Sequence, residues 1–351
     1  MINSSSLFHF TRDFGAFKRI LTEGLRFGYC YEPFGEIVAK QGWNKELKRG
    51  NKVITCEGIA IPLISFCDIP LLRAQEHRKR FGDYMIGFNR EALINVINAT
   101  KYMLNPVQYR CHPFFDEQLE ELSIQKSCFI SQIESSEIPI GGIEIRKGEK
   151  RDEMKFSNLI MRSEIREKYK EEIQKITAID SIIGFSKPYQ GKCGDDYMSE
   201  REWRIIIPDC NRPAPNLGWL KYISKEQFEH YKIKLLDNYP SELYLHFDCV
   251  DLTSLITHIV VSKESERNLL IHFCLNKGNN VLGCNLSESQ RMNLISKISS
   301  FEQIERDYYC IKYQIHVWIG LNMKVFKNLY NVSMLTCLET IYQKTNLFVS
   351  G

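Results

Sequence analysis

Paired cysteines are absent from this sequence. Twelve cysteines are scattered singly along 351 residues, and no two of them form a C-x-x-C pair. Zinc ribbons and thioredoxin-like redox sites need that spacing, so neither class is supported. The first residues carry no apolar signal-peptide core, so we expect a cytoplasmic protein with reduced thiols.

Long apolar runs, nucleotide-binding glycine motifs and strong net charge are also missing. No apolar run reaches the roughly 18 residues of a membrane span, so we expect no membrane attachment. Neither G-x-G-x-x-G after a strand nor G-x-x-x-x-G-K-[ST] occurs, which removes the Rossmann and P-loop sites. A net charge of +3 is too small to indicate a nucleic-acid partner, although it does not exclude one.

The pattern of apolar residues indicates an α+β protein. With 44% hydrophobic and 25% charged residues, the composition is that of an ordinary globular chain. Apolar alternation predicts strands over 6–11, 58–68, 84–88, 107–110, 181–186, 243–247 and 257–262. Helical spacing predicts helices over 14–23, 72–80, 90–99, 113–135, 165–176 and 263–276. This order favours a mixed β-sheet with helical insertions. We expect this sheet to form one domain, residues 1–300. To the extension that follows, residues 301–351, the pattern assigns no definite structure.

The stretch Met198–Pro208, MSEREWRIIIP, is the strongest candidate site. In a strand, Glu200, Glu202 and Arg204 would point to one face. The apolar residues that follow would anchor the strand, so the two carboxylates could act in acid–base chemistry or bind a cation. The alternative is a solvated strand start with Glu–Arg pairs, because charged residues are mostly exposed.

Four strings of this sequence, in order, resemble the bacterial AbiGi-like abortive-infection family. They are LFHFT with its following Gly-Leu (7–25), ISFCDIPL (64–71), His77 with FGDYMIGF (81–88), and EREWR (200–204). The resemblance covers roughly residues 7–275. It implies a phage-resistance protein of a two-component system, whose members of this type are regarded as antitoxins that bind a partner protein.

A more distant resemblance is to the ADP-ribosyltransferase fold, in which a split mixed sheet binds NAD. By matching position it implies NAD as substrate, without a metal, and a modified host or phage target. The implied NAD-binding residues are His9, Thr11, Arg12 and Ser65. The implied catalytic residues are Glu202, which would stabilise positive charge on the ribose, Glu200, which would act as base towards the acceptor, and His9.

Two hypotheses therefore stay open. The chain is either an NAD-using ADP-ribosyltransferase-like effector or a non-catalytic antitoxin that binds a partner toxin. They differ in whether the Glu202 carboxylate lines an NAD-sized pocket or is held in ion pairs with Arg201 or Arg204. A third hypothesis, a metal-dependent nuclease, has weaker support, since the sequence contains no H-x-x-x-H or D-x-D cluster that could form a two-metal site.

Overall fold

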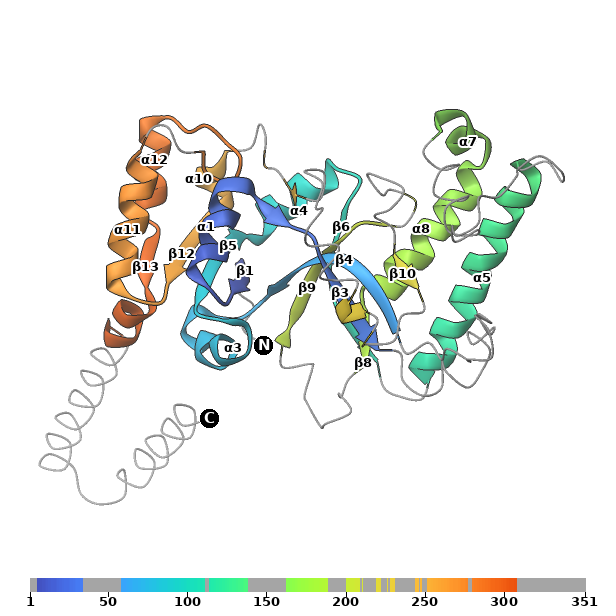
Figure 1. Ribbon diagram of the computed structural model, residues 1–351, viewed down its shortest axis with the longest axis horizontal. Helices are drawn as coiled ribbons and strands as arrows, with labels where there is room; N and C mark the ends of the chain where they lie inside the picture. The colour runs from blue at the N-terminus through green and yellow to red at the C-terminus, as the bar shows by residue number, and fades with distance from the viewer. Residues whose placement is uncertain are drawn as a thin grey trace, which may run out of the picture.

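The computed structural model shows a mixed α/β architecture built on one large sheet (Figure 1). It describes residues 5–33, 58–110, 114–137, 162–188, 200–208, 210, 219–221, 226, 228–230, 244–245, 247, 251–276 and 280–307. In Figure 1 the sheet runs through the middle, with α11 and α12 at one end and α5 and α8 at the other.

The large sheet has nine strands, and all but one of its pairings are antiparallel. Its order is β13 (Ile298–Ser300), β12 (Ile256–Val261), β5 (Tyr84–Asn89), β1 (Ser6–Thr11), β4 (Gly58–Cys67), β9 (Glu202–Ile206) and β6 (Met103–Pro106). Two further strands, β3 (Gly28–Pro33) and β10 (Leu220–Lys221), also pair with β4. The parallel pair is β12–β13, so the sheet is mixed.

Shorter pairs and helices complete the described elements. The small sheets pair β2 (Leu25–Arg26) with β11 (Tyr244–Leu245), and β7 (Gln108–Arg110) with β8 (Ser186–Pro188). The helices are α1 (Phe14–Glu23), a 3₁₀ turn (Leu71–Arg73), α3 (Ala74–Phe81), α4 (Arg90–Asn98), α5 (Phe114–Glu137), α7 (Ser163–Lys168), α8 (Lys170–Gly184), α10 (Leu252–Leu255), α11 (Glu264–Leu275) and α12 (Glu288–Ile295).

The sheet is split along one edge of strand β4. Leu63 pairs with β3 and β9, and Cys67 pairs with β1 and β9, so β3 and β1 share one edge of β4. Between these two contacts, residues 64–66 have no strand partner on that edge within the described residues. The sheet therefore splits beside Ser65, the residue that the sequence placed in the middle of this strand.

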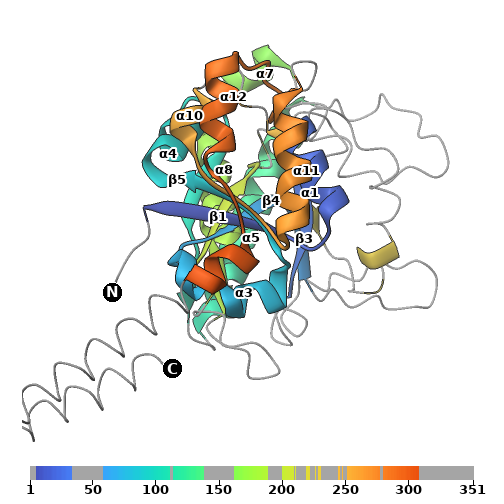
Figure 2. The ribbon, with the colours of Figure 1, turned by 90° about the vertical axis from the view of Figure 1, so that its left-hand side faces the viewer.

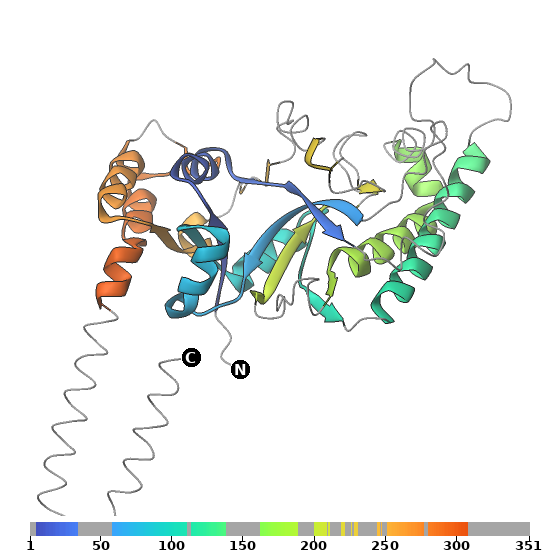
Figure 3. The same ribbon diagram turned by 60° about the horizontal axis from the view of Figure 1, so that its bottom comes forward.

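Both faces of the sheet are covered, which explains why β4 reads as an almost continuous apolar run. One face packs against α1, α4, α10, α11 and α12 through a core that includes Phe17, Leu21, Phe66 and Phe88. Figure 2, viewed from the α11–α12 end, shows α1 and α11 in front of the sheet. At the β3–β4–β9 end, α8 packs on the opposite face (Figure 3), and near β1 that face packs around Phe8 and Met85.

Most predicted elements are present, and the exceptions have physical reasons. Strand β1 and helix α1 have the expected bounds. The predicted strand 181–186 is mostly the last turn of α8, because Ile173, Ile176 and Ile183 continue one buried helical face. The segment after α1, where no strand was predicted, contains β3. Residues 301–307 are helical and the rest of the predicted extension lies outside the described residues, so the division at residue 300 stays a prediction.

No helix in the part of the chain that the structure describes combines the length and apolarity that a membrane crossing requires.

Gly82, at the end of α3, offers a test of how the sheet and α3 are joined. Its φ is +117°, and a Cβ there would lie 2.2 Å from the Thr11 carbonyl oxygen. Gly82→Ala should lower the free energy of unfolding by about 2–4 kcal/mol, measured by urea denaturation. Gly28→Ala, where a Cβ would meet no atom within 4 Å, should change it by less than about 0.5 kcal/mol. Equal effects of the two substitutions would contradict this packing.

Candidate functional site

The EREWR stretch lies beside β4, where the sheet splits. Ser65 pairs with Arg204 and Cys67 pairs with Glu202, so these four side chains share one face of the sheet. The expectation of one continuous strand from Glu200 was wrong. Strand β9 starts at Glu202, because Arg201 has a left-handed backbone with φ 46°. That conformation is uncommon for a non-glycine residue, and such residues concentrate at functional sites.

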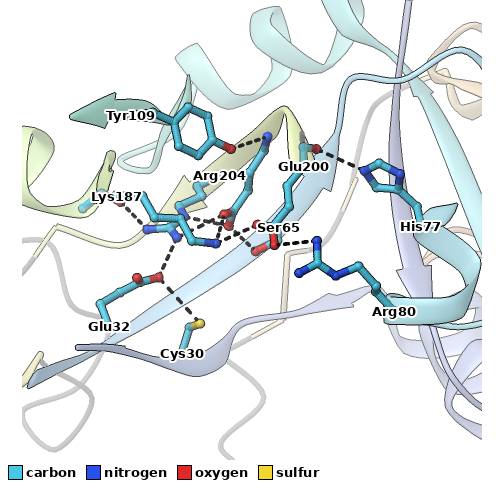
Figure 4. A network of polar contacts seen from close by, with 11 residues as sticks. Cys30, Glu32, Ser65, His77, Arg80, Tyr109, Lys187, Glu200 and Arg204 are labelled. Carbon is cyan, nitrogen blue, oxygen red and sulfur yellow. Dashed lines mark hydrogen bonds and ion pairs between the residues drawn. The ribbon is translucent and has the colours of Figure 1, made fainter. Parts of the chain in front are cut away.

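The Glu202 carboxylate is held entirely by the protein's own donors, which are Ser65, Lys187 and Arg204. Figure 4 labels these three residues within the polar network. The Oε1 of Glu202 accepts from Ser65 Oγ at 2.9 Å and from Arg204 Nε at 2.7 Å. Its Oε2 accepts from Arg204 Nη2 and from Lys187 Nζ, each at 3.1 Å. A carboxylate has about four acceptor positions, so these four bonds fill it.

Arg204 is fully buried and joins three elements. Besides Glu202, its guanidinium donates to Glu32 Oε1 on β3 at 2.5 Å. It also donates to the Gly184 carbonyl at the end of α8 at 3.0 Å. Burying a guanidinium is tolerable only when it is paired and hydrogen-bonded, as it is here.

Lys187, on β8, bridges the two glutamates. Its Nζ donates to Glu200 Oε2 at 2.7 Å as well as to Glu202. The other oxygen of Glu200 lies 3.6 Å from Arg80 Nη1, which is an ion pair without a hydrogen bond. Tyr109 also holds Glu202 in place, since its hydroxyl accepts a hydrogen bond from the Glu202 backbone N–H at 3.1 Å.

The electrostatics keep Glu202 and Lys187 charged at neutral pH. Burial alone would raise the pKa of Glu202, but Arg204 and Lys187 outweigh it and lower that pKa to about 2. Burial opposes the charge of Lys187, yet the surrounding glutamates raise its pKa above the ordinary value. Burial also raises the pKa of the Cys30 thiol, a neighbour of Glu32, to about 12, so this thiol is protonated at neutral pH.

His9 lies at the split but belongs to the other face of the sheet. Phe8 pairs with Cys67 on the Glu202 face, so strand alternation turns His9 towards Phe66, and their ring centroids are 5.8 Å apart. His9 Nδ1 lies 2.9 Å from the Ser65 carbonyl oxygen and must be the donor, because a carbonyl only accepts. Burial lowers the pKa of His9, so a neutral ring closes the gap in the ladder.

The other predicted residues lie at the edge of this region. Arg12 is exposed and donates to the Arg80 carbonyl at 3.1 Å, at the end of α3. Thr11 ends β1 opposite Tyr84. The structure thus gathers Ser65, Glu200 and Glu202 in one network and leaves the side chains of His9 and Arg12 outside it.

Sequence reasoning missed Glu32 and Lys187. Glu32 lies in a segment for which no strand was predicted, and Lys187 follows residues 181–186, which were predicted to be a strand. Alternation along β3 would put Glu32 on the same face as Cys30, but its contact with Arg204 depends on the pairing of β3 with β4. Within the described ranges, no group of three or more His, Cys, Asp or Glu residues could hold a metal ion.

The lowered pKa of Glu202 makes stability depend on pH with a defined sign. Its folded pKa of about 2 lies below the ordinary 4.5, so it stabilises the fold above pH 4.5 and that contribution is lost as pH falls towards 2. Glu202→Gln should flatten the curve of unfolding free energy against pH by about 3 kcal/mol across that window, measured by urea denaturation. The exposed control Glu171→Gln should leave the curve unchanged. Parallel curves for wild type and Glu202→Gln would contradict the network.

Comparison with known proteins identifies a family. The model of the family described as "Putative abortive phage resistance protein AbiGi, antitoxin" matches residues 39–258, more than half of the chain. No curated protein and no solved structure matches. The matched range contains Ser65, Lys187 and the whole EREWR stretch. The chain belongs to the AbiGi family of abortive phage-resistance proteins.

Proposed function

We propose that this chain is an antitoxin of a phage-resistance system, which acts by binding a partner toxin and not by catalysis. The observation that carries the proposal is the complete occupation of the Glu202 carboxylate by Ser65, Lys187 and Arg204. The family description as an antitoxin supports the same conclusion.

A catalytic role for Glu202 would require these bonds to break. A ribose hydroxyl could bind the carboxylate only by displacing Ser65, Lys187 or Arg204. Hydrogen bonds between ionised partners are roughly twice as strong as neutral ones. Displacing Arg204 would also leave a buried cation without its counter-ion, which typically costs about 3–5 kcal/mol. The network therefore favours a structural use of Glu202.

The placement of His9 also favours binding over catalysis. An NAD site of the kind implied by the ADP-ribosyltransferase resemblance needs His9 and Glu202 to reach one ligand. Here, His9 packs against Phe66 and bonds the Ser65 backbone, while Glu202 lies on the opposite face. We therefore assign His9 to holding β1 against β4 at the split.

A second candidate is an NAD-using ADP-ribosyltransferase-like effector, and one observation favours it. His9, Ser65 and Glu202 are linked by hydrogen bonds where β1 and β3 part along β4. They follow one another in the chain in the order that the resemblance implies. In that case, Glu202 would stabilise the positive charge on the ribose as nicotinamide leaves with the bonding electrons. Glu200 would take the proton of the attacking acceptor.

A growth experiment separates the two candidates. The toxin component of the same system is expressed with wild type, Glu202→Gln or Glu32→Gln. An antitoxin that acts by binding should relieve growth arrest with all three variants, because both substitutions keep the shape of the side chain. Circular dichroism at pH 7 establishes that each variant is folded.

Glu32→Gln is the matched control, since Glu32 bonds the same Arg204 but has no catalytic role in either candidate. Loss of relief with Glu202→Gln alone, together with nicotinamide release from NAD by wild type only, would replace the binding proposal by the catalytic one.

A further inference from the structure

One side of α3 binds the helix formed by residues 301–307 (Figure 2). Gln75 Nε2 donates to Glu305 Oε1 at 3.5 Å, and Arg78 Nη1 donates to the same oxygen. The Arg78 guanidinium also lies over the Phe301 ring, with Cζ 4.0 Å from the ring centroid. Phe301 is buried. An ion pair and a cation–π contact from one arginine therefore hold this helix against α3.

The other side of α3 faces the carboxylate network (Figure 4). His77 Nε2 lies 3.4 Å from the Glu200 carbonyl oxygen, and Arg80 Nη1 lies 3.6 Å from Glu200 Oε1. Both distances exceed the usual length of about 2.9 Å for an N–H···O bond. Residues three apart share a helix face, and a step of two residues turns about 200° around the helix. The pair His77 and Arg80 therefore lies opposite the pair Gln75 and Arg78.

The helix 301–307 is itself anchored to the far edge of the sheet. The Gln303 N–H donates to Ser300 Oγ at 3.1 Å, so the last residue of β13 caps this helix. The Ser300 hydroxyl donates to Glu264 Oε2 at 2.7 Å, and the Glu264 N–H donates to Glu302 Oε2 at 2.9 Å. The helix therefore connects β13 and the start of α11 with α3.

We propose that α3 is a connector that transmits changes at the helix 301–307 to Glu200. The contacts with Glu305 and Phe301 are close, whereas those with Glu200 are long, so the position of α3 beside Glu200 depends on the helix 301–307. Glu200 in turn bonds Lys187, which also bonds Glu202. A partner that binds or displaces the helix 301–307 would thereby act on the carboxylate network.

The connector goes beyond the function proposed above and does not depend on it. It concerns the position of the Glu200 carboxylate, whether that carboxylate only stabilises the fold or takes a proton from an acceptor.

Carbon-13 NMR of the full chain tests the connector. The readout is the Glu200 carboxyl resonance, assigned by its loss in Glu200→Gln, in wild type, Glu305→Gln and Glu302→Gln. Both test substitutions remove one negative charge from the same helix, but Glu302 bonds the backbone at the start of α11. Glu305→Gln should shift the Glu200 resonance, because Arg78 loses its charged partner on this helix, and Glu302→Gln should leave it in place.

A coupling acts in both directions, so Glu200→Gln should shift the Arg78 Nε–H resonance, a proton that Arg78 donates to Asp83 at 2.9 Å. Gln75→Ala, which removes only the weaker bond to Glu305, should shift the Glu200 resonance less than Glu305→Gln does. Circular dichroism establishes that each variant is folded. A Glu200 resonance that stays in place in Glu305→Gln, or that moves equally in Glu302→Gln, would overturn the connector and leave the antitoxin function intact.

Discussion

A buried guanidinium is the constraint on which the rest of the site depends. Arg204 has no exposed surface, and it lies on the strand next to β4. An arginine cannot lose its charge in a protein, so burying one commits the surrounding structure to supplying counter-ions. Glu202 on the same strand and Glu32 on β3 meet that demand, and the Gly184 carbonyl fixes the end of α8 against them. One side chain thus ties together elements from three distant parts of the chain.

The split in the sheet explains the remaining polar contacts. Where β1 and β3 part along β4, the backbone of Ser65 loses its strand partner on that edge. A side chain takes the place of that partner for the Ser65 carbonyl, while the Ser65 side chain bonds on the other face of the sheet. His9 satisfies the Ser65 carbonyl, and the Ser65 hydroxyl satisfies Glu202. His9 and Ser65, which the ADP-ribosyltransferase resemblance groups with Glu202, thus each make a hydrogen bond at the divided part of the sheet.

The local patterns of the sequence predicted β1 and α1 to the residue, because alternation and a capped amphipathic helix depend on neighbours in sequence. The same patterns failed at 181–186, where the isoleucine run fits a strand as well as a buried helix. The pairing of Glu202 with Arg204 was within reach of the sequence. Lys187 and Glu32 were not, because their contacts with the EREWR stretch depend on how β3 and β8 dock.

The Glu202 carboxylate is held by Ser65, Lys187 and Arg204, and this bonding can be tested directly. The most direct measurement is the carbon-13 carboxyl resonance of Glu202, assigned by its loss in Glu202→Gln, followed from pH 7 to pH 3 with and without excess NAD. We expect a resonance that stays that of an ionised carboxylate over this range and does not move when NAD is added. A shift on adding NAD, or protonation near pH 4.5, would contradict the account and return Glu202 to the catalytic hypothesis.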